Sequence, residues 1–152
     1  MAVVSLYSDA SFCVKNHLAA YSCRVVGARG HWRTTAQVPG HVEDNNTAEL
    51  YATVHGLVGA LRAGVLGEGD KVLVYTDSYF SIERIDGRKE LKVTLEQQKL
   101  VTLAKRVITG FGLEVVLKHV QGHSGATGPL TGAIRDCDIN ARNELNRLRS
   151  LL

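Results

Sequence analysis

The sequence has little of what marks disordered, membrane-spanning or secreted chains. It contains only two prolines among 152 residues and no low-complexity stretch, so nothing in it indicates disorder. No apolar run approaches the ~20 residues that a membrane-spanning helix needs. The first residues, MAVVSLYSDA, lack the basic and long apolar segments of a secretory signal, so we expect none. These absences favour an intracellular, cytoplasmic protein.

Cysteine is scarce as well. The three cysteines, Cys13, Cys23 and Cys137, lie far apart and show no CxxC spacing. An odd number at such spacing argues against both a disulfide framework and a structural zinc site. We therefore expect three reduced thiols, as is usual inside cells.

The composition is that of an ordinary globular protein. Apolar residues make up 45% and charged residues 22% of a chain long enough to bury a core without disulfides. We expect a single domain over residues 1–152. The net charge of +3 is mildly basic, which permits a polyanionic partner without requiring one.

Three β-prone segments come first and are followed by helices and strands in alternation. Strands are expected at residues 3–9, 18–26, 31–38, 71–76 and 113–120. Helices are expected at residues 47–63, 78–86, 91–109 and 136–152, with a glycine-rich loop at 122–132. Leading strands favour an antiparallel meander, and later strands separated by helices favour parallel crossovers. The sequence therefore predicts an α/β fold of order βββαβαβα, a five-stranded mixed sheet flanked by helices.

Four acidic residues fall where this fold brings elements together. Asp9 ends the first strand and Asp77 follows the fourth, and the carboxyl ends of neighbouring parallel strands lie side by side. Glu49 opens the first long helix, and Asp138 lies in the first turn of the last. Each acid also has an ordinary alternative as a turn residue, a cap or a partner of the helix dipole. Asn46 is the expected cap of the first long helix, in a weak capping box with Glu49.

Carboxylates that converge at one site indicate the binding of divalent metal ions. They repel one another unless cations neutralise them, and hard oxygen ligands select Mg²⁺ or Mn²⁺. Two such ions about 3.5–4 Å apart hydrolyse phosphate esters, because one makes hydroxide from water and the other stabilises the leaving oxygen. The four acids therefore predict a two-metal site for phosphoryl hydrolysis.

The last acid has a neighbour that competes with it. On a helical wheel, the apolar residues of 136–152 gather on one side, which Asp138 flanks. Asp136 points nearly the opposite way. We therefore expect Asp138 to face the domain, and Asp136 to face solvent or cap the helix.

Five segments together resemble type 1 ribonuclease H. They are SDAS (8–11), NNTAEL (45–50), VYTDS (74–78), VQGHSG (120–125) and RDCDINARNEL (135–145). They occur in the family's order, each on the matching element, and the similarity spans essentially the whole chain.

The resemblance implies a metal-dependent endonuclease that cleaves the RNA strand of RNA–DNA hybrids and leaves 3′-hydroxyl and 5′-phosphate ends. It implies that Asp9, Glu49, Asp77 and Asp138 bind the metal ions. It also implies that His123 is the loop histidine that helps proton transfer or product release. An imidazole in a glycine-rich loop suits that role, and His119 at a strand end is the alternative.

The resemblance also assigns substrate contacts. Asn45 and Asn46 match residues that contact the minor groove of the hybrid, and Ser78 matches a serine that contacts the nucleic-acid backbone or supports the site. Amides both donate and accept, which suits the 2′-hydroxyls exposed in a shallow minor groove. Capping of the first long helix is the ordinary alternative for Asn46.

The sequence departs from the family pattern in three places, one of which is the long gap with extra glycines between His123 and Asp138. Ala10 stands where the family usually has glycine. The only tryptophan is Trp32, so the tryptophan-rich basic handle of some members is not expected. Residues 84–106 hold seven basic side chains against three acids, which indicates either a reduced phosphate-binding surface or a solvated helix face.

Two other functions fit the same pattern less well. One is a nuclease of the same fold that acts on DNA junctions or double-stranded RNA. The other is a non-catalytic module that binds nucleic acid or protein, which the complete set of acids disfavours. No membrane or protein partner is evident from the sequence.

Overall fold

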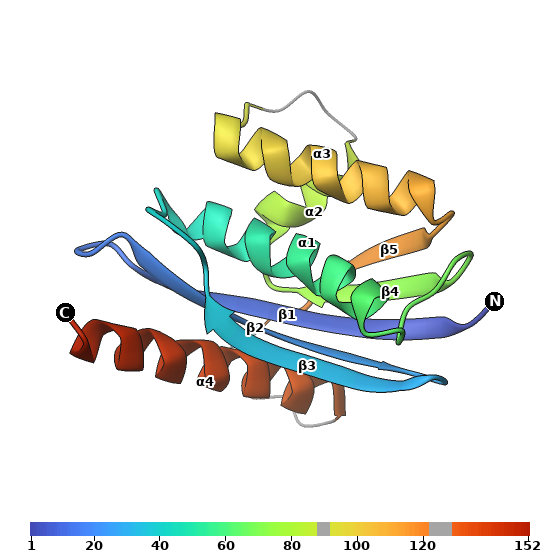
Figure 1. The fold of residues 1–152 in the computed structure, drawn as a ribbon, viewed down its shortest axis with the longest axis horizontal. Helices are drawn as coiled ribbons and strands as arrows, with labels where there is room; N and C mark the ends of the chain where they lie inside the picture. The colour runs from blue at the N-terminus through green and yellow to red at the C-terminus, as the bar shows by residue number, and fades with distance from the viewer. Residues whose placement is uncertain (88–91, 122–128) are drawn as a thin grey trace.

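A five-stranded mixed sheet with helices on both faces forms the framework (Figure 1). The computed structural model describes residues 1–87, 92–121 and 129–152. The strands are β1 (Val3–Cys13), β2 (Leu18–Gly27), β3 (Gly30–Gln37), β4 (Lys71–Thr76) and β5 (Glu114–His119). The helices are α1 (Asn45–Arg62), α2 (Tyr79–Asp86), α3 (Leu95–Gly110) and α4 (Pro129–Ser150). The predicted α/β fold is confirmed, and the order is βββαβααβα because α2 and α3 both lie between β4 and β5.

β1 is the central strand of the sheet, whose order is β3-β2-β1-β4-β5. It pairs antiparallel with β2 and parallel with β4, as predicted. The parallel register ends at Tyr7 opposite Tyr75, but the antiparallel ladder with β2 continues to Cys13. β1 therefore does not end at Asp9, as the small polar residues there suggested. It only parts from β4 at that point.

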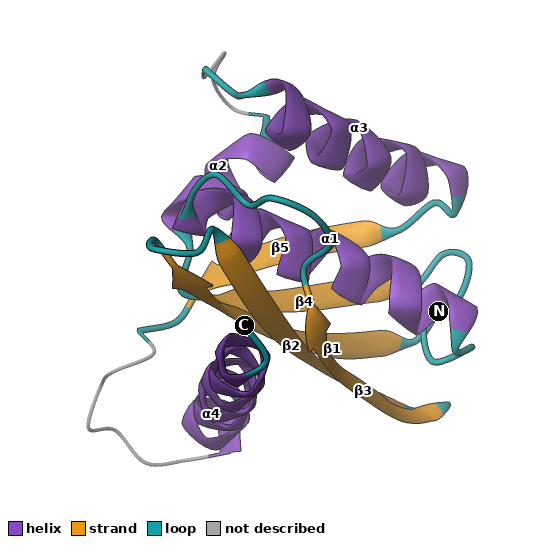
Figure 2. Cartoon of the chain, turned by 60° about the vertical axis from the view of Figure 1, so that its left-hand side comes forward, coloured by secondary structure: helices purple, strands orange, loops and turns teal. Residues whose placement is uncertain are grey.

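Alternation along β1 sends successive side chains to opposite faces of the sheet. Figures 1 and 2 show α1, α2 and α3 on one face and α4 alone on the other. Ser8 faces α1, where its hydroxyl lies 3.0 Å from that of Thr53. The backbone carbonyl of Tyr7 accepts a weak bond from the Cys137 thiol of α4 at 3.8 Å. Asp9 and Asp77, which follow Tyr7 and Tyr75, therefore lie where the helices of both faces approach the sheet.

Glycines let α1 approach the sheet closely. A Cβ on Gly56 would lie 3.1 Å from Cys23 Sγ of β2, and one on Gly59 would lie 2.1 Å from the Trp32 ring of β3. Beneath α1, the largest group of buried side chains joins β1, β2 and β4 to its last turns. It includes Leu6, which is fully buried.

The starts of α1, α3 and α4 differ from those predicted. α1 begins at Asn45, and its N-cap is Asp44, whose carboxylate accepts from the Thr47 N–H and the Thr47 hydroxyl, both at 2.8 Å. Asn46 therefore lies inside the first turn and forms no capping box with Glu49. α3 begins after a capping box formed by Thr94 and Gln97, later than residue 91.

α4 begins at Pro129, well before the predicted start at residue 136. Proline is favoured in the first turn of a helix, where its missing N–H leaves no intrahelical bond unmade. Part of the predicted 122–132 loop is therefore helical, and residues 122–128 lie outside the described residues. Asp138 consequently lies well inside α4 instead of in its first turn. None of the described helices combines the length and apolarity needed to cross a bilayer.

Candidate metal site

Three of the four predicted acids converge where β1 parts from β4. Asp9 of β1, Glu49 of α1 and Asp77 after β4 each offer one carboxylate oxygen, and these oxygens lie within 4.8 Å of one another. Asp9 is 4% and Glu49 5% exposed, and Asp77 is partly exposed. Among residues 1–87, 92–121 and 129–152, no other group of three or more His, Cys, Asp or Glu side chains has this arrangement.

Hydrogen bonds hold the elements that bring these acids together. The Thr53 hydroxyl contacts Ser8 of β1 and also donates to the Glu49 carbonyl at 3.4 Å, which ties this part of α1 to the central strand. On the other side, the Ser78 N–H donates to the Thr76 hydroxyl at 3.1 Å and shapes the turn that carries Asp77. The site is therefore built on the sheet and α1.

Burial and crowding change the protonation of the site. Burial, with the nearby charge of Asp77, raises the pKa of Asp9 to about 7. Burial, followed by the charges of Asp9 and Asp77, raises the pKa of Glu49 well above its usual range. A hydrogen bond between Asp9 and Glu49 lowers the pKa of Asp9 and raises that of Glu49, so Glu49 is the protonated partner. Without a cation, the pair retains a proton near neutral pH.

The donor set fits a hard divalent cation. Glu49 Oε2 is buried and has no hydrogen-bond partner among the described residues. A buried oxygen acceptor without a partner is costly, and coordination to a metal ion removes that cost. Three carboxylates with no thiolate or imidazole among them match the ligands of Mg²⁺ and Mn²⁺.

Asp138 lies outside this group of three. Its carboxylate accepts a hydrogen bond from Arg142 one turn later in α4, yet its charge is close enough to raise the pKa of Asp9. Its side chain is 21% exposed, against 64% for Asp136, which pairs with Arg24 at 3.9 Å. The exposure of the two acids agrees with the helical wheel.

The other predicted site residues lie around the acids. Asn45 and Asn46 are exposed on the first turn of α1, just before Glu49. Ser78 is buried, and its hydroxyl accepts from the Ser81 N–H at 3.1 Å as the N-cap of α2. His123 lies outside the described residues.

His119 was only an alternative to His123 in the sequence, but it has a defined place. Its Nε2 lies 3.1 Å from the carbonyl oxygen of Asp77, and its ring stacks on Tyr79. Neither contact has a sequence signal, because both depend on the register between β4 and β5.

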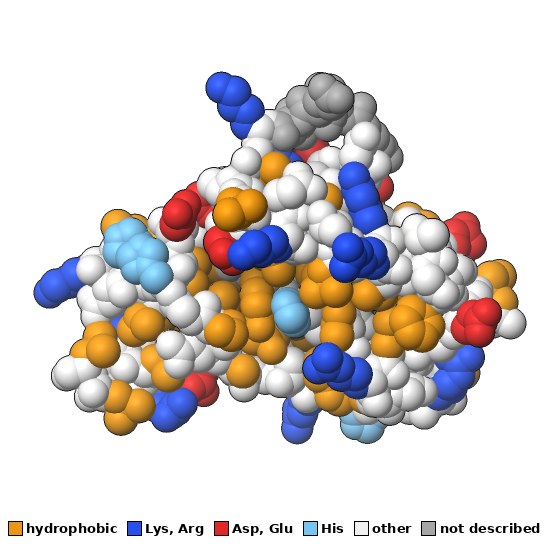
Figure 3. All heavy atoms as spheres, turned by 45° about the horizontal axis from the view of Figure 1, so that its top comes forward, with side chains coloured by type: hydrophobic (Ala, Val, Ile, Leu, Met, Phe, Trp, Pro, Cys, Tyr) orange, Lys and Arg blue, Asp and Glu red, His pale blue; other side chains and the backbone are white. Residues whose placement is uncertain are grey.

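The described basic residues of 84–106 lie in different surroundings. The Arg84 guanidinium lies 3.9 Å from the centre of the Phe80 ring and pairs with Glu83 at 3.3 Å. Lys105 and Arg106 of α3 are exposed, and Arg88 and Lys89 lie outside the described residues. Figure 3 shows Lys and Arg side chains dispersed around an apolar strip on this side of the molecule.

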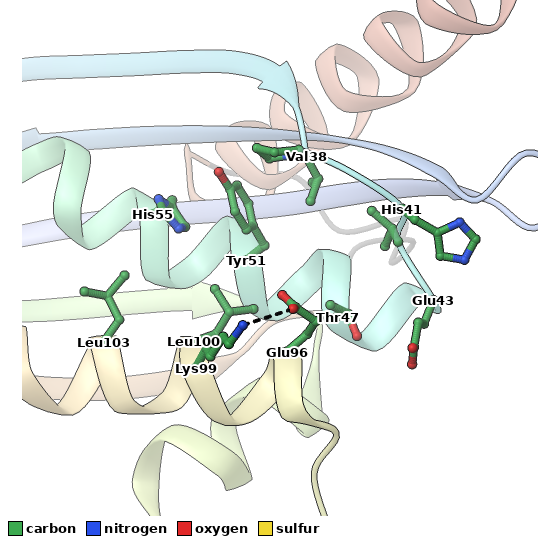
Figure 4. A pocket seen from close by; sticks show the side chains of 12 residues that line it. Val38, His41, Glu43, Thr47, Tyr51, His55, Glu96, Lys99, Leu100 and Leu103 are labelled. Carbon is green, nitrogen blue, oxygen red and sulfur yellow. Dashed lines mark ion pairs between the residues drawn. The ribbon is translucent and has the colours of Figure 1, made fainter.

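A cavity of about 310 Å³ lies between α1, α3 and the chain that precedes α1 (Figure 4). Tyr51 and His55 of α1 stack along its wall at 4.0 Å, and Lys99 pairs with Glu96 at its edge at 3.6 Å. Burial and the charge of Arg62 lower the pKa of His55. The sequence did not predict this cavity. Asp9, Glu49 and Asp77 do not line it.

Comparisons with known proteins agree on the fold. The family model described as RNase H matches residues 1–145. The N-terminal RNase H domain of a Mycobacterium tuberculosis protein, solved as a fusion with maltose-binding protein, superposes with a TM-score of 0.77 at 19% identity, over 100% of both chains. RNase H1 from the archaeon Halobacterium salinarum has a TM-score of 0.69 at 19% identity, over 95% of this chain and 98% of that one. LC11-RNase H1, solved in complex with an RNA/DNA hybrid, has a TM-score of 0.68 at 14% identity over the same shares. No curated protein sequence matches the chain significantly.

Proposed function

Because this chain belongs to the RNase H family and is a ribonuclease H, we propose that it hydrolyses the RNA strand of RNA–DNA hybrids with two divalent metal ions. The group of Asp9, Glu49 and Asp77 carries this proposal, since three carboxylates converge where a cation would remove their repulsion. One similar structure is an RNase H1 in complex with an RNA/DNA hybrid, which supports the substrate.

Asp9, Glu49, Asp77 and Asp138 are the proposed ligands for Mg²⁺ or Mn²⁺. When bound, the ions supply a hydroxide nucleophile and stabilise the leaving oxygen, which gives 3′-hydroxyl and 5′-phosphate ends. Asp9 and Glu49 would give up their shared proton to bind an ion, and the unpaired Glu49 Oε2 would serve as a ligand atom. Asp138, whose carboxylate pairs with Arg142, would be the fourth ligand.

The remaining proposed roles concern the substrate and the proton. Asn45 and Asn46, exposed beside the acids, contact the 2′-hydroxyls and base edges of the minor groove. Ser78 supports the site by capping α2, and His123 assists proton transfer or product release. We place this activity in one domain over residues 1–152. We also place it in the cytoplasm, where three free and buried thiols are stable.

Cleavage of matched, end-labelled substrates tests the proposal. With Mg²⁺ or Mn²⁺, the protein should cut the RNA strand of a hybrid and leave RNA duplex, DNA duplex and a DNA junction intact. Asp9→Asn should abolish cleavage and leave hybrid binding largely unchanged, because it removes a ligand charge and keeps the shape of the side chain. A hybrid that survives both metals contradicts the proposed activity, and an active Asp9→Asn variant contradicts the metal site.

A further inference from the structure

The carbonyl of Asp77 is held by a side chain of the neighbouring strand. β4 and β5 pair in parallel up to Thr76 opposite His119, and the Val120 N–H then donates to the Thr76 carbonyl at 2.9 Å. The next carbonyl along, that of Asp77, lies 3.1 Å from His119 Nε2. A carbonyl only accepts, so Nε2 carries the hydrogen and donates it. An imidazole thus extends the ladder by one bond beyond the backbone pairing.

Tyr79 fixes the other side of this imidazole. The two rings stack with centroids 3.7 Å apart and planes 5° apart. Tyr79 is the first residue of α2, and the capping bond from Ser81 to the Ser78 hydroxyl fixes the backbone beside it. The residue is nevertheless 62% exposed, so burial in a core does not explain its position. Its stacking on the imidazole of His119 accounts for that position.

Asp77 connects this pair to the acids. Its carboxylate belongs to the group of three, and its carbonyl is the acceptor for His119. A rotation of the Asp77 peptide would therefore displace a ligand oxygen. Coordination distances tolerate errors of only about 0.2 Å, and residues that orient a ligand are worth about 10–100-fold in metal affinity or activity.

We propose that His119 and Tyr79 are a positioning pair for the metal site. His119 fixes the backbone of Asp77, and Tyr79 holds the imidazole in the orientation that donates and shields the bond from water. The pair acts through Asp77 and touches neither ion nor substrate. This inference rests on the proposed metal-dependent function.

Two variants of His119 distinguish the effect of its hydrogen bond to the Asp77 carbonyl from the effect of its stacking on Tyr79. His119→Phe keeps a flat ring to stack on Tyr79 but removes the donor, and His119→Gln restores an N–H near the position of Nε2. Binding of Mn²⁺ to each protein without nucleic acid, followed by the electron paramagnetic resonance of free Mn²⁺, reports the site directly. We expect His119→Phe to bind Mn²⁺ about 10–100-fold more weakly and His119→Gln to recover most of the loss. Wild-type affinity in His119→Phe would overturn the inference.

Variants of Tyr79 test the second half of the pair. Tyr79→Phe keeps the ring and should bind Mn²⁺ as the wild type does. Tyr79→Ala removes the ring from an exposed position, so the fold is retained, and its Mn²⁺ affinity should fall in the same direction as that of His119→Phe. If His119→Phe does not fold, the Mn²⁺ affinity of Tyr79→Ala tests the proposed positioning pair instead. An unchanged affinity in Tyr79→Ala contradicts the role of the stack.

Kinetics distinguish positioning from a purely structural role. Saturating Mn²⁺ should restore the kcat of His119→Phe and leave its KM for the hybrid unchanged. A structural role alone would lower the melting temperature in EDTA and leave the Mn²⁺ affinity of the folded protein intact, which would refute the pair. If the wild type binds Mn²⁺ and cuts hybrid but His119→Phe equals it, only this inference fails. If the wild type does neither, the proposed function fails first.

Discussion

The carboxyl groups of Asp9 and Glu49 share a hydrogen bond in the interior, although one stands on β1 and the other on α1. Two carboxyl groups make such a bond only while one of them is protonated. A proton and a divalent cation therefore compete for the carboxylate oxygens of Asp9 and Glu49. Two predictions rest on this competition, and neither needs a nucleic acid.

Mg²⁺ or Mn²⁺ should stabilise the folded protein. An ion that binds the folded chain alone raises the free energy of unfolding by about 2.7 kcal/mol at a hundredfold excess over Kd. Urea unfolding in the presence of metal and of EDTA measures this difference. Asp9→Asn should lose most of it, and Asp136→Asn, which alters an exposed acid, should keep it. Superimposable wild-type curves with and without metal would contradict a metal site.

The stability of the metal-free protein should fall as pH rises. The pKa of Asp9 goes from its ordinary 3.8 to about 7 on folding, so between these values the folded chain holds a proton that the unfolded chain has lost. Stability is thus greatest below about pH 4 for this group and falls through pH 7, by up to about 1.4 kcal/mol per pH unit. Glu49 acts in the same direction. Denaturant titrations in EDTA should show a shallower slope for Asp9→Asn than for the wild type. The same slope in both proteins would exclude the raised pKa of Asp9.

Asp138 and Asp136 offer a matched pair two residues apart on α4. Asp138→Asn should lower hybrid cleavage at least about tenfold, because a ligand of the metal ions is weakened. Asp136→Asn should leave it unchanged, since that acid is exposed and pairs only with Arg24 among the described residues. Initial rates at fixed metal concentration compare the two. Equal rates for both variants would remove Asp138 from the site.

Gly59 and Gly110 should respond to alanine with opposite signs. A Cβ on Gly59 meets the Trp32 ring at 2.1 Å, so Gly59→Ala should lower stability by roughly 1–3 kcal/mol and shift the fluorescence of the only tryptophan. A Cβ on Gly110, in the last turn of α3, meets nothing within 4 Å. Gly110→Ala should therefore be neutral or raise stability by up to about 1 kcal/mol. Thermal melts followed by circular dichroism test both, and a tolerated Gly59→Ala would mean that Trp32 moves freely.

The meeting of Asp9 and Asp77 was predictable from the sequence. Both acids follow apolar segments that pair as parallel neighbours, and such strands end at the same edge of a sheet. The true end of β1 was not predictable, because small polar residues after Asp9 resemble a strand terminus. Pairing with β2, which a local pattern does not contain, carries the strand on to Cys13.

The start of α4 was hidden for a related reason. Gly132 weakens the helical pattern, at a cost of about 1 kcal/mol relative to alanine. Tertiary packing outweighs that cost, since Ala133 and Ile134 are buried against the rest of the protein. The place of His119 was equally out of reach, because its partner is a backbone carbonyl that only the paired strands bring near.

The central position of β1 also has a consequence for how the chain folds. The hairpin of β1 and β2 joins residues close in sequence, but the pairing of β1 with β4 places Val3 opposite Lys71. Closing so long a loop costs entropy before contacts reward it, and such non-local pairings slow folding. During synthesis, the group of Asp9, Glu49 and Asp77 cannot assemble until β4 has left the ribosome. Substitutions along the boundary of β1 and β4 should therefore delay the appearance of the site more than they alter the finished protein.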